Sequence, residues 1–78
     1  MQYHQRIRNI REDKDLNQSV IANLLKTTRS YYGQYERNVR PMTADQIIEI
    51  AKFYNLSADY ILGLIDEERP LYFKKGTK

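Results

Sequence analysis

The chain has 78 residues, no cysteine and a net charge of +3 at pH 7. A chain of this length forms one small domain that buries about 60% of its unfolded surface. The lack of cysteine excludes disulfides and thiolate metal sites. No signal peptide is recognisable, and no apolar run approaches the roughly 20 residues of a membrane span. We therefore expect a cytoplasmic protein with no metal, no cofactor and no membrane partner.

The charges are divided unevenly along the chain. Residues 1–40 hold eight basic and four acidic residues, residues 41–69 hold two basic and six acidic ones, and residues 70–78 hold three lysines. A basic half attracts phosphates from a distance, whereas an acidic half is repelled by them. Each single charge could equally be an ordinary solvated side chain. The cations expected at the surface of the basic half are Arg6, Arg8, Lys14, Lys26, Arg29, Arg37 and Arg40.

Residues 16–36 predict two short helices joined by a tight turn. Asn17 is a good N-cap, and Leu16 is spaced to pack on Ile21 as a hydrophobic staple. Gln18 is expected at the exposed N-terminal end of this helix. The helical period predicts a buried stripe of Ile21, Ala22 and Leu25.

Thr28 is a second N-cap, so the next helix is expected to begin at Arg29. At 100° per residue, one side of this helix carries Thr28, Tyr32, Tyr35 and Glu36. The opposite side carries Ser30, Gln34 and Arg37, flanked by Arg29, Tyr31 and Gly33. This outer side has no carboxylate and offers hydrogen-bond donors for phosphates and for base edges in the major groove.

Two further helices are predicted after Pro41. Thr43 and Gln46 form a capping box, Asn55 is a plausible left-handed helix stop, and Ser57 caps the last helix. The expected core positions are Ile47, Ile48, Ala51, Tyr54 and Ile61, with Leu64 or Ile65 after them. The domain should be all-α, with five helices.

The tail is predicted to be separate from the domain, which would span residues 1–66, with the tail at 67–78. Pro70 ends helical structure, and Leu71, Tyr72 and Phe73 then expose three large apolar groups. They could fold back on the first helix near Tyr3, or they could form a short strand or arm in a dimer contact.

From about Ile7 to Gly63 the chain resembles the Cro and phage-repressor type of helix-turn-helix protein. The resemblance is carried by IRNIRE as the first helix, LNQSVIANLLKTTRSYYGQYER as the reading motif, RP, and IIEIAKFYNLSADYILGL as the last two helices. It implies a compact lambda-repressor-like domain with its helix-turn-helix at about residues 17–36. The implied function is a bacterial or phage-encoded, sequence-specific regulator, a repressor that binds a double-stranded DNA operator as a homodimer.

The resemblance also assigns roles to particular residues. Bases would be contacted by Arg29, Ser30 and Gln34, with Tyr31 and Gly33 as further candidates. Phosphates would be contacted by Gln18, Thr28 and Arg37, with Arg40 and Lys26 as further candidates from the basic half. Arg11 and Glu36 would form a structural ion pair, which agrees with the residues themselves because a carboxylate on the inner side of a helix needs a cation.

Three positions depart from the family's pattern. Lys26 stands where glycine is common, at a turn position that often needs a left-handed backbone, so either Lys26 accepts strain or the turn differs. Gly33 lies in mid-helix at a cost of about 1 kcal/mol relative to alanine, which either allows a closer approach to DNA or is simply tolerated. Tyr31 could touch a thymine methyl, bond a phosphate, or only cover the side facing the preceding helix.

Two other kinds of function remain open on the same fold. One is a protein-interaction module such as an antirepressor or adaptor, and the other is an antitoxin that represses its own gene and has a regulatory protein partner. An interaction module would tend to place apolar anchors where Ser30, Gln34 and Arg37 stand. His4 has no neighbouring ligand or nucleophile, so the chain is not expected to be an enzyme.

Overall fold

The computed structural model describes residues 1–71, which form five α-helices and no strand. The helices are α1 (Tyr3–Asp13), α2 (Gln18–Leu24), α3 (Arg29–Glu36), α4 (Ala44–Tyr54) and α5 (Ala58–Leu62). The predicted all-α architecture of five helices is confirmed.

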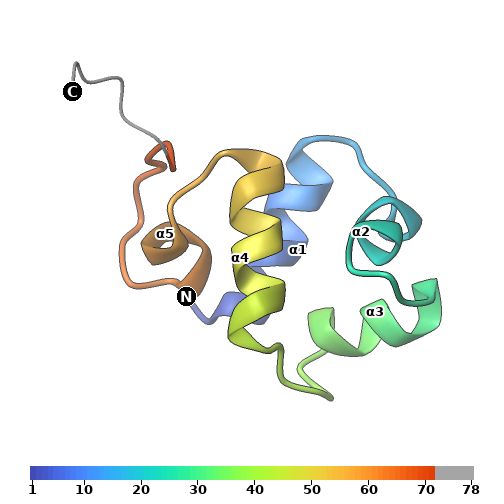
Figure 1. The fold of residues 1–78 in the computed structure, drawn as a ribbon. Helices are drawn as coiled ribbons and strands as arrows, with labels where there is room; N and C mark the ends of the chain where they lie inside the picture. The colour runs from blue at the N-terminus through green and yellow to red at the C-terminus, as the bar shows by residue number, and fades with distance from the viewer. Residues whose placement is uncertain (72–78) are drawn as a thin grey trace.

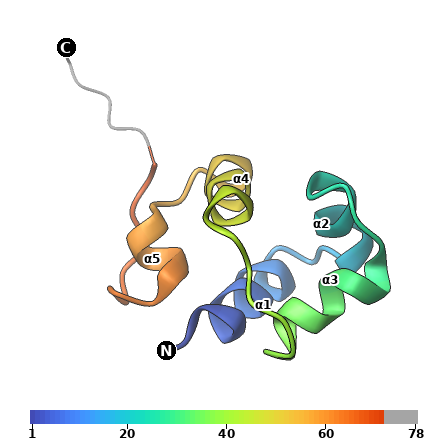
Figure 2. The same ribbon diagram turned by 60° about the horizontal axis from the view of Figure 1, so that its bottom comes forward.

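The helices contact one another in a closed ring, in the order α1, α3, α2, α4, α5 and back to α1. In Figure 1, α2 and α3 lie on one side of the molecule and α5 lies on the other. Figure 2 shows from a second direction that α3 stays at the edge, away from α5. The side chains that fill the ring are mainly aliphatic, and the most buried of them are Ile7, Ile10, Ile21, Ala22, Tyr32, Ile50, Ala51 and Ile61.

Four of the five helices begin with a polar side chain that accepts a backbone hydrogen bond. In each case the side-chain oxygen accepts from the N–H three residues further on, which satisfies one amide that has no partner inside the helix. At α4 the two residues form a capping box, because the side chain of Gln46 also accepts from the N–H of Thr43. The predicted caps are confirmed at Asn17, Thr28, Thr43 and Ser57.

All five helices end in the same backbone motif. A residue with positive φ donates its N–H to the carbonyl three residues earlier, and the next residue donates to the carbonyl five residues earlier, which is a Schellman motif. The left-handed residues are Asp15, Lys26, Asn38, Asn55 and Gly63. The predicted left-handed stop at Asn55 is therefore confirmed. Asp, Asn and Gly are the residue types that adopt this conformation most readily, so Lys26 is the exception.

Lys26 adopts the left-handed backbone that the turn between α2 and α3 requires. Its φ is 60°, and the N–H of Thr27 donates to the carbonyl of Ala22 at 2.9 Å. The sequence left open whether Lys26 accepts strain or the turn differs. In the structure the turn has the same motif as the other helix ends, and Lys26 accepts the strain. A lysine Cβ in this conformation costs about 1–2 kcal/mol relative to glycine.

Replacing Lys26 with glycine should raise the free energy of unfolding by about 1 kcal/mol, because the strain disappears while glycine loses more backbone entropy on folding. Urea unfolding followed by circular dichroism measures the change. Lys26→Ala is the matched control, since it removes the same side-chain charge but keeps the Cβ. Equal stabilities of the glycine and alanine variants would contradict the assignment of strain to this backbone.

The predicted core position Ile48 is wrong, and of the alternatives Leu64 and Ile65 it is Ile65 that is half-buried. Ile48 is 46% exposed and Leu64 is 72% exposed. The buried positions of α4 are Ile47, Ile50 and Ala51, and Ile48 is rotated about 100° from Ile47 toward solvent. Leu64 follows the left-handed Gly63, so the chain has already left the helix and the helical period no longer predicts which side chains face inward.

The described end of the tail pairs with the loop between α4 and α5. Ser57 donates its N–H to the carbonyl of Arg69 at 2.7 Å, and Leu71 donates to the carbonyl of Asn55 at 3.2 Å. For Leu71, the predicted return to the first helix near Tyr3 is therefore wrong. The opposite edge of this short segment presents Pro70, which has no N–H to donate. Tyr72 and Phe73 lie outside the described residues.

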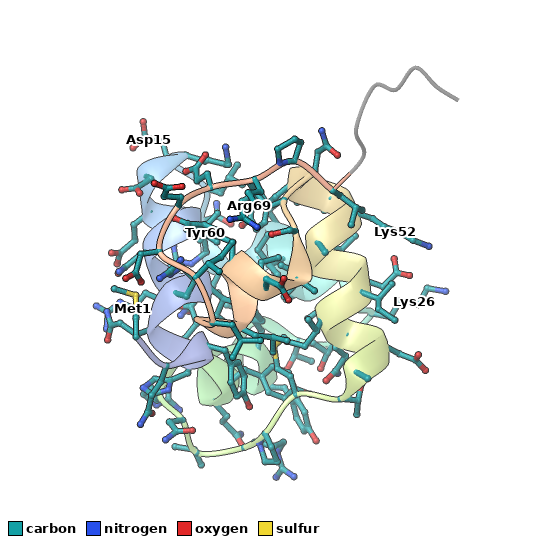
Figure 3. All side chains as sticks on the ribbon, turned by 90° about the vertical axis from the view of Figure 1, so that its left-hand side faces the viewer. Met1, Asp15, Lys26, Lys52, Tyr60 and Arg69 are labelled. Atoms are coloured by element: carbon teal, nitrogen blue, oxygen red, sulfur yellow. The ribbon has the colours of Figure 1, made fainter. Side chains whose placement is uncertain are left out.

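Arg6 joins the start of the chain to its end. Its side chain is 5% exposed, and its guanidinium donates to the carbonyls of Tyr60 and Ile65 at 3.1 and 3.3 Å and to Asp66 at 3.2 Å. Figure 3 shows Tyr60 projecting from α5 toward α1, where the Arg6 guanidinium lies 4.0 Å from the centre of its ring. The prediction that Arg6 is a surface cation of the basic half is wrong, because its side chain is buried. The sequence does not reveal this, since the oxygen atoms that accept from it lie far away along the chain.

Candidate nucleic-acid interface

The two sides of α3 differ sharply in exposure. The inner side is buried and consists of Tyr32, Gly33, Tyr35 and Glu36. The outer side is open to solvent: Arg29, Ser30, Tyr31 and Arg37 are exposed, and Gln34 is half-buried. The structure therefore has the two sides that the helical period predicts, with two differences: Gly33 lies on the inner side, and the cap residue Thr28, predicted on the inner side, is exposed.

The carboxylate of Glu36 links three helices. Its side chain is 2% exposed, and it accepts from Arg11 of α1 through Nε at 2.7 Å and through Nη2 at 3.0 Å. The amide of Gln18, the first residue of α2, donates to the same carboxylate at 3.1 Å. Arg11 also donates to the carbonyl of Leu16 at 2.8 Å, in the loop before α2. These bonds fix the rotation of α3 about its own axis and thereby decide which side chains face solvent.

Protonation of this cluster follows from its hydrogen bonds. Burial by itself would raise the pKa of Glu36, but hydrogen bonds from Arg11, Tyr32 and Gln18 outweigh it, and the pKa lies below its usual range. The hydrogen bond to Glu36 likewise raises the pKa of Arg11. Burial, followed by the neighbouring Glu36, raises the pKa of Tyr32. At neutral pH the ion pair is charged and the tyrosine is neutral.

Replacing Arg11 with methionine should lower the free energy of unfolding by about 3–5 kcal/mol at pH 7, because it leaves the buried carboxylate without its cation. Arg8→Met is the matched control. Arg8 pairs with Glu12 on the surface of α1, with side chains 52% and 50% exposed, and its loss should cost less than about 1 kcal/mol. Denaturant unfolding of the two variants measures the difference.

The pH dependence checks the same interaction. Since the folded pKa of Glu36 is lowered, its stabilising contribution is present above the unfolded value of about 4.3 and disappears as pH falls through the folded pKa. The difference in stability between wild type and Arg11→Met should therefore shrink in acid. A difference that does not change with pH would contradict the assignment to a charged Glu36.

Gly33 lies under two side chains. A Cβ built on it would be 3.0 Å from Nη1 of Arg37 and 3.7 Å from Oε1 of Gln18. The side chains of these residues therefore occupy the space next to the glycine, and this placement does not favour Gly33 as a base-contacting residue. Gln18 is half-buried rather than exposed, and one of its amide hydrogens is used by Glu36.

The candidate phosphate contacts differ in where they lie. Thr28, Arg37 and Arg40 are exposed at the two ends of α3. Lys26 instead borders a groove of about 280 Å³ together with Asp45 and Glu49 of α4, and Figure 3 shows its side chain on the same side as Lys52. The carboxylates next to Lys26 do not favour a contact with phosphate.

One arrangement on the outer side was missed by the sequence reasoning. Nε of Arg40 donates to Oε1 of Gln34 at 3.3 Å, and its guanidinium lies 4.8 Å from the centre of the Tyr31 ring. Asn38 was the available signal, because an asparagine just after a helix indicates a left-handed end that turns the chain back.

The fold and this site define a helix-turn-helix domain of five helices. The chain belongs to the helix-turn-helix domain family whose model matches residues 4–67. Among its relatives is YobD, an HTH-type transcriptional regulator of Bacillus subtilis, which is 34% identical over 76 residues; the match covers 97% of this chain and 68% of that protein. The regulator PrpR of Mycobacterium tuberculosis is 33% identical over 55 residues, which cover 70% of this chain and 11% of PrpR.

Two solved structures share the fold. A transcriptional regulator from Listeria innocua has a TM-score of 0.77 at 21% identity, over 85% of this chain and 62% of that one. The P22 c2 repressor, solved in complex with a synthetic operator, has a TM-score of 0.71 at 21% identity, over 81% of this chain and 96% of that one. The chain thus spans only part of the length of several of its relatives.

Within residues 1–71, none of the helices combines the length and the apolar character that crossing a membrane requires. The same residues contain no group of three or more His, Asp or Glu side chains able to hold a metal ion.

Proposed function

We propose that the protein is a transcriptional regulator that binds double-stranded operator DNA through the outer side of α3 and represses transcription in the cytoplasm of a bacterium. The observation that carries this proposal is that Arg29, Ser30 and Arg37 are exposed, with the half-buried Gln34 among them, on one side of a helix whose only carboxylate, Glu36, is buried on the other. A helix with this composition can enter the major groove without bringing a negative charge near the phosphates.

The roles of the residues follow from their places on α3. Arg29 and Ser30, at the N-terminal end of the helix, and Gln34, one turn further, contact base edges. Thr28 and Arg37, at the two ends of the helix, contact phosphates of the strands on either side of the groove. The relatives named as transcriptional regulators and the operator complex of the P22 c2 repressor, which has the same fold, support the proposal that the protein binds operator DNA.

Replacing Gln34 with alanine should relax discrimination at one base pair of the operator, at a cost of about 1–3 kcal/mol in binding to the preferred sequence. Selection from random duplexes followed by titration measures both effects. Arg37→Ala is the matched control from the same side, and it should weaken all sequences alike and reduce the salt dependence of binding. An unchanged preferred sequence for Gln34→Ala would contradict its role as a base reader.

We further propose that the protein binds as a homodimer on a two-fold operator. An apolar groove of about 310 Å³ runs between α4 and α5, with Ile47, Ile48 and Leu62 in its lining. Ile48 is 46% exposed and Leu62 is 40% exposed, which is unusual for neighbouring aliphatic side chains on a small domain. Figure 1 shows α5 on the side of the molecule away from α3, so a second copy at this groove leaves both reading helices free.

Replacing Ile48 with glutamate should convert the dimer to a monomer, because a charge would be buried in the apolar interface. Sedimentation equilibrium measures the change in mass. Phe53→Glu is the control, since Phe53 is equally exposed on α4 but does not line this groove. A dimer that survives Ile48→Glu would place the interface elsewhere.

A further inference from the structure

We infer that Arg40 is a positioning residue that sets the base preference of Gln34, so that Gln34 selects guanine rather than adenine. The inference rests on the proposed function, since it concerns how the outer side of α3 reads a base. It starts from the three residues that meet there: Gln34 and Tyr31 of α3, and Arg40 of the loop that follows.

The backbone at the end of α3 places Arg40 over the helix it has just left. Asn38 has a φ of 61°, and its N–H donates to the carbonyl of Tyr35 at 3.2 Å. The next two amides, of Val39 and Arg40, both donate to the carbonyl of Gln34, at 2.8 and 3.3 Å. The left-handed residue thus reverses the chain, and residue 40 is tied to residue 34 by the backbone before any side-chain contact is considered.

The Arg40 side chain is held at two points. Its Nε donates to Oε1 of Gln34 at 3.3 Å, and its guanidinium lies 4.8 Å from the centre of the Tyr31 ring, within the range of a cation–π contact. Tyr31 in turn packs edge-to-face on Tyr35, with ring centres 5.7 Å apart. Tyr35 is 4% exposed, and its hydroxyl accepts from Gln46 of α4 at 2.9 Å. The Tyr31 ring, which is the platform beneath Arg40, is therefore anchored in the core through Tyr35.

The chemistry of the two side chains determines how the Gln34 amide is turned. Arginine has donors only, so the group of Gln34 that faces Arg40 must be the amide oxygen. The amide nitrogen, with two hydrogens to donate, is then left to face the groove. A free glutamine recognises adenine by using both atoms, the oxygen accepting from N6 and the nitrogen donating to N7. Contact with Arg40 competes for the oxygen that this pairing needs.

The base edges then favour guanine at this position. In the major groove guanine presents two acceptors, N7 and O6, whereas adenine presents one acceptor and one donor. An amide nitrogen with two hydrogens can donate to both acceptors of guanine. At adenine one of these hydrogens would face the N6 donor. Arg40 thus acts on recognition through Gln34, without needing to touch the base itself.

The test compares operator selection by the wild type and by Arg40→Met, using random duplexes at a fixed salt concentration. At the base pair whose discrimination is lost in Gln34→Ala, the wild type should prefer guanine. In Arg40→Met the ratio of guanine to adenine should fall by about tenfold, because the amide regains the pairing with adenine. Tyr31→Leu, which removes the platform beneath Arg40, should shift the same ratio in the same direction and serves as the second variant.

Arg37→Met is the matched control, since it removes the same charge from the same side of the helix. It should lower affinity for all sequences and reduce the slope of log affinity against log salt by about one unit, with the base preference unchanged. If Arg40→Met behaves like Arg37→Met, or if the wild type selects adenine, the inference is overturned while the proposed function stands. If the wild type shows no salt-dependent binding to any duplex, the proposed function itself fails.

Discussion

The ion pair between Arg11 and Glu36 is the interaction on which the orientation of α3, and with it the proposed DNA-reading surface, depends. The carboxylate is almost completely buried, and it receives hydrogen bonds from α1 and α2 while it belongs to α3. A buried charge with its partners in place has one acceptable orientation, since any rotation of α3 would leave it unpaired at a cost of several kcal/mol. Because Glu36 is held inward, the residues on the opposite side of the same helix are held outward. The surface proposed to bind DNA is therefore determined by hydrogen bonds inside the molecule.

Much of this arrangement could be predicted because it depends on residues close together in the sequence. The four side-chain caps and the left-handed Asn55 act over three to five residues, so their residue types and spacing predict them directly. The two sides of α3 follow from the helical period once its first residue is known. Charge distribution, by contrast, predicts only that one half of the chain is suited to nucleic acid, and it does not tell which cation makes a contact.

The predictions that failed required knowledge of distant contacts or of where a helix ends. Arg6 is indistinguishable from a surface arginine in the sequence, because its oxygen acceptors lie more than 50 residues away. Ile48 and Ile50 are both aliphatic residues of one helix. Which of them is buried depends on how α4 is rotated against α2 and α5. Leu71 lies beside the α4–α5 loop because its backbone N–H donates to the carbonyl of Asn55. No pattern of side chains in the sequence predicts this bond. Arg40 lies beyond the helix and returns to it only because Asn38 reverses the chain.

The hydrogen bonds on the inner and outer sides of α3 contribute very differently to the stability of the fold. On the inner side, the bonds to Glu36 are buried, so the loss of one partner affects the stability of the whole domain. On the outer side, the bond between Arg40 and Gln34 is exposed, and water can replace either partner at little cost to folding. The fold therefore constrains the first network strongly and the second weakly. With the roles proposed for Gln34 and Arg40, substitutions at these two positions would change the base that is selected while α3 stays in place.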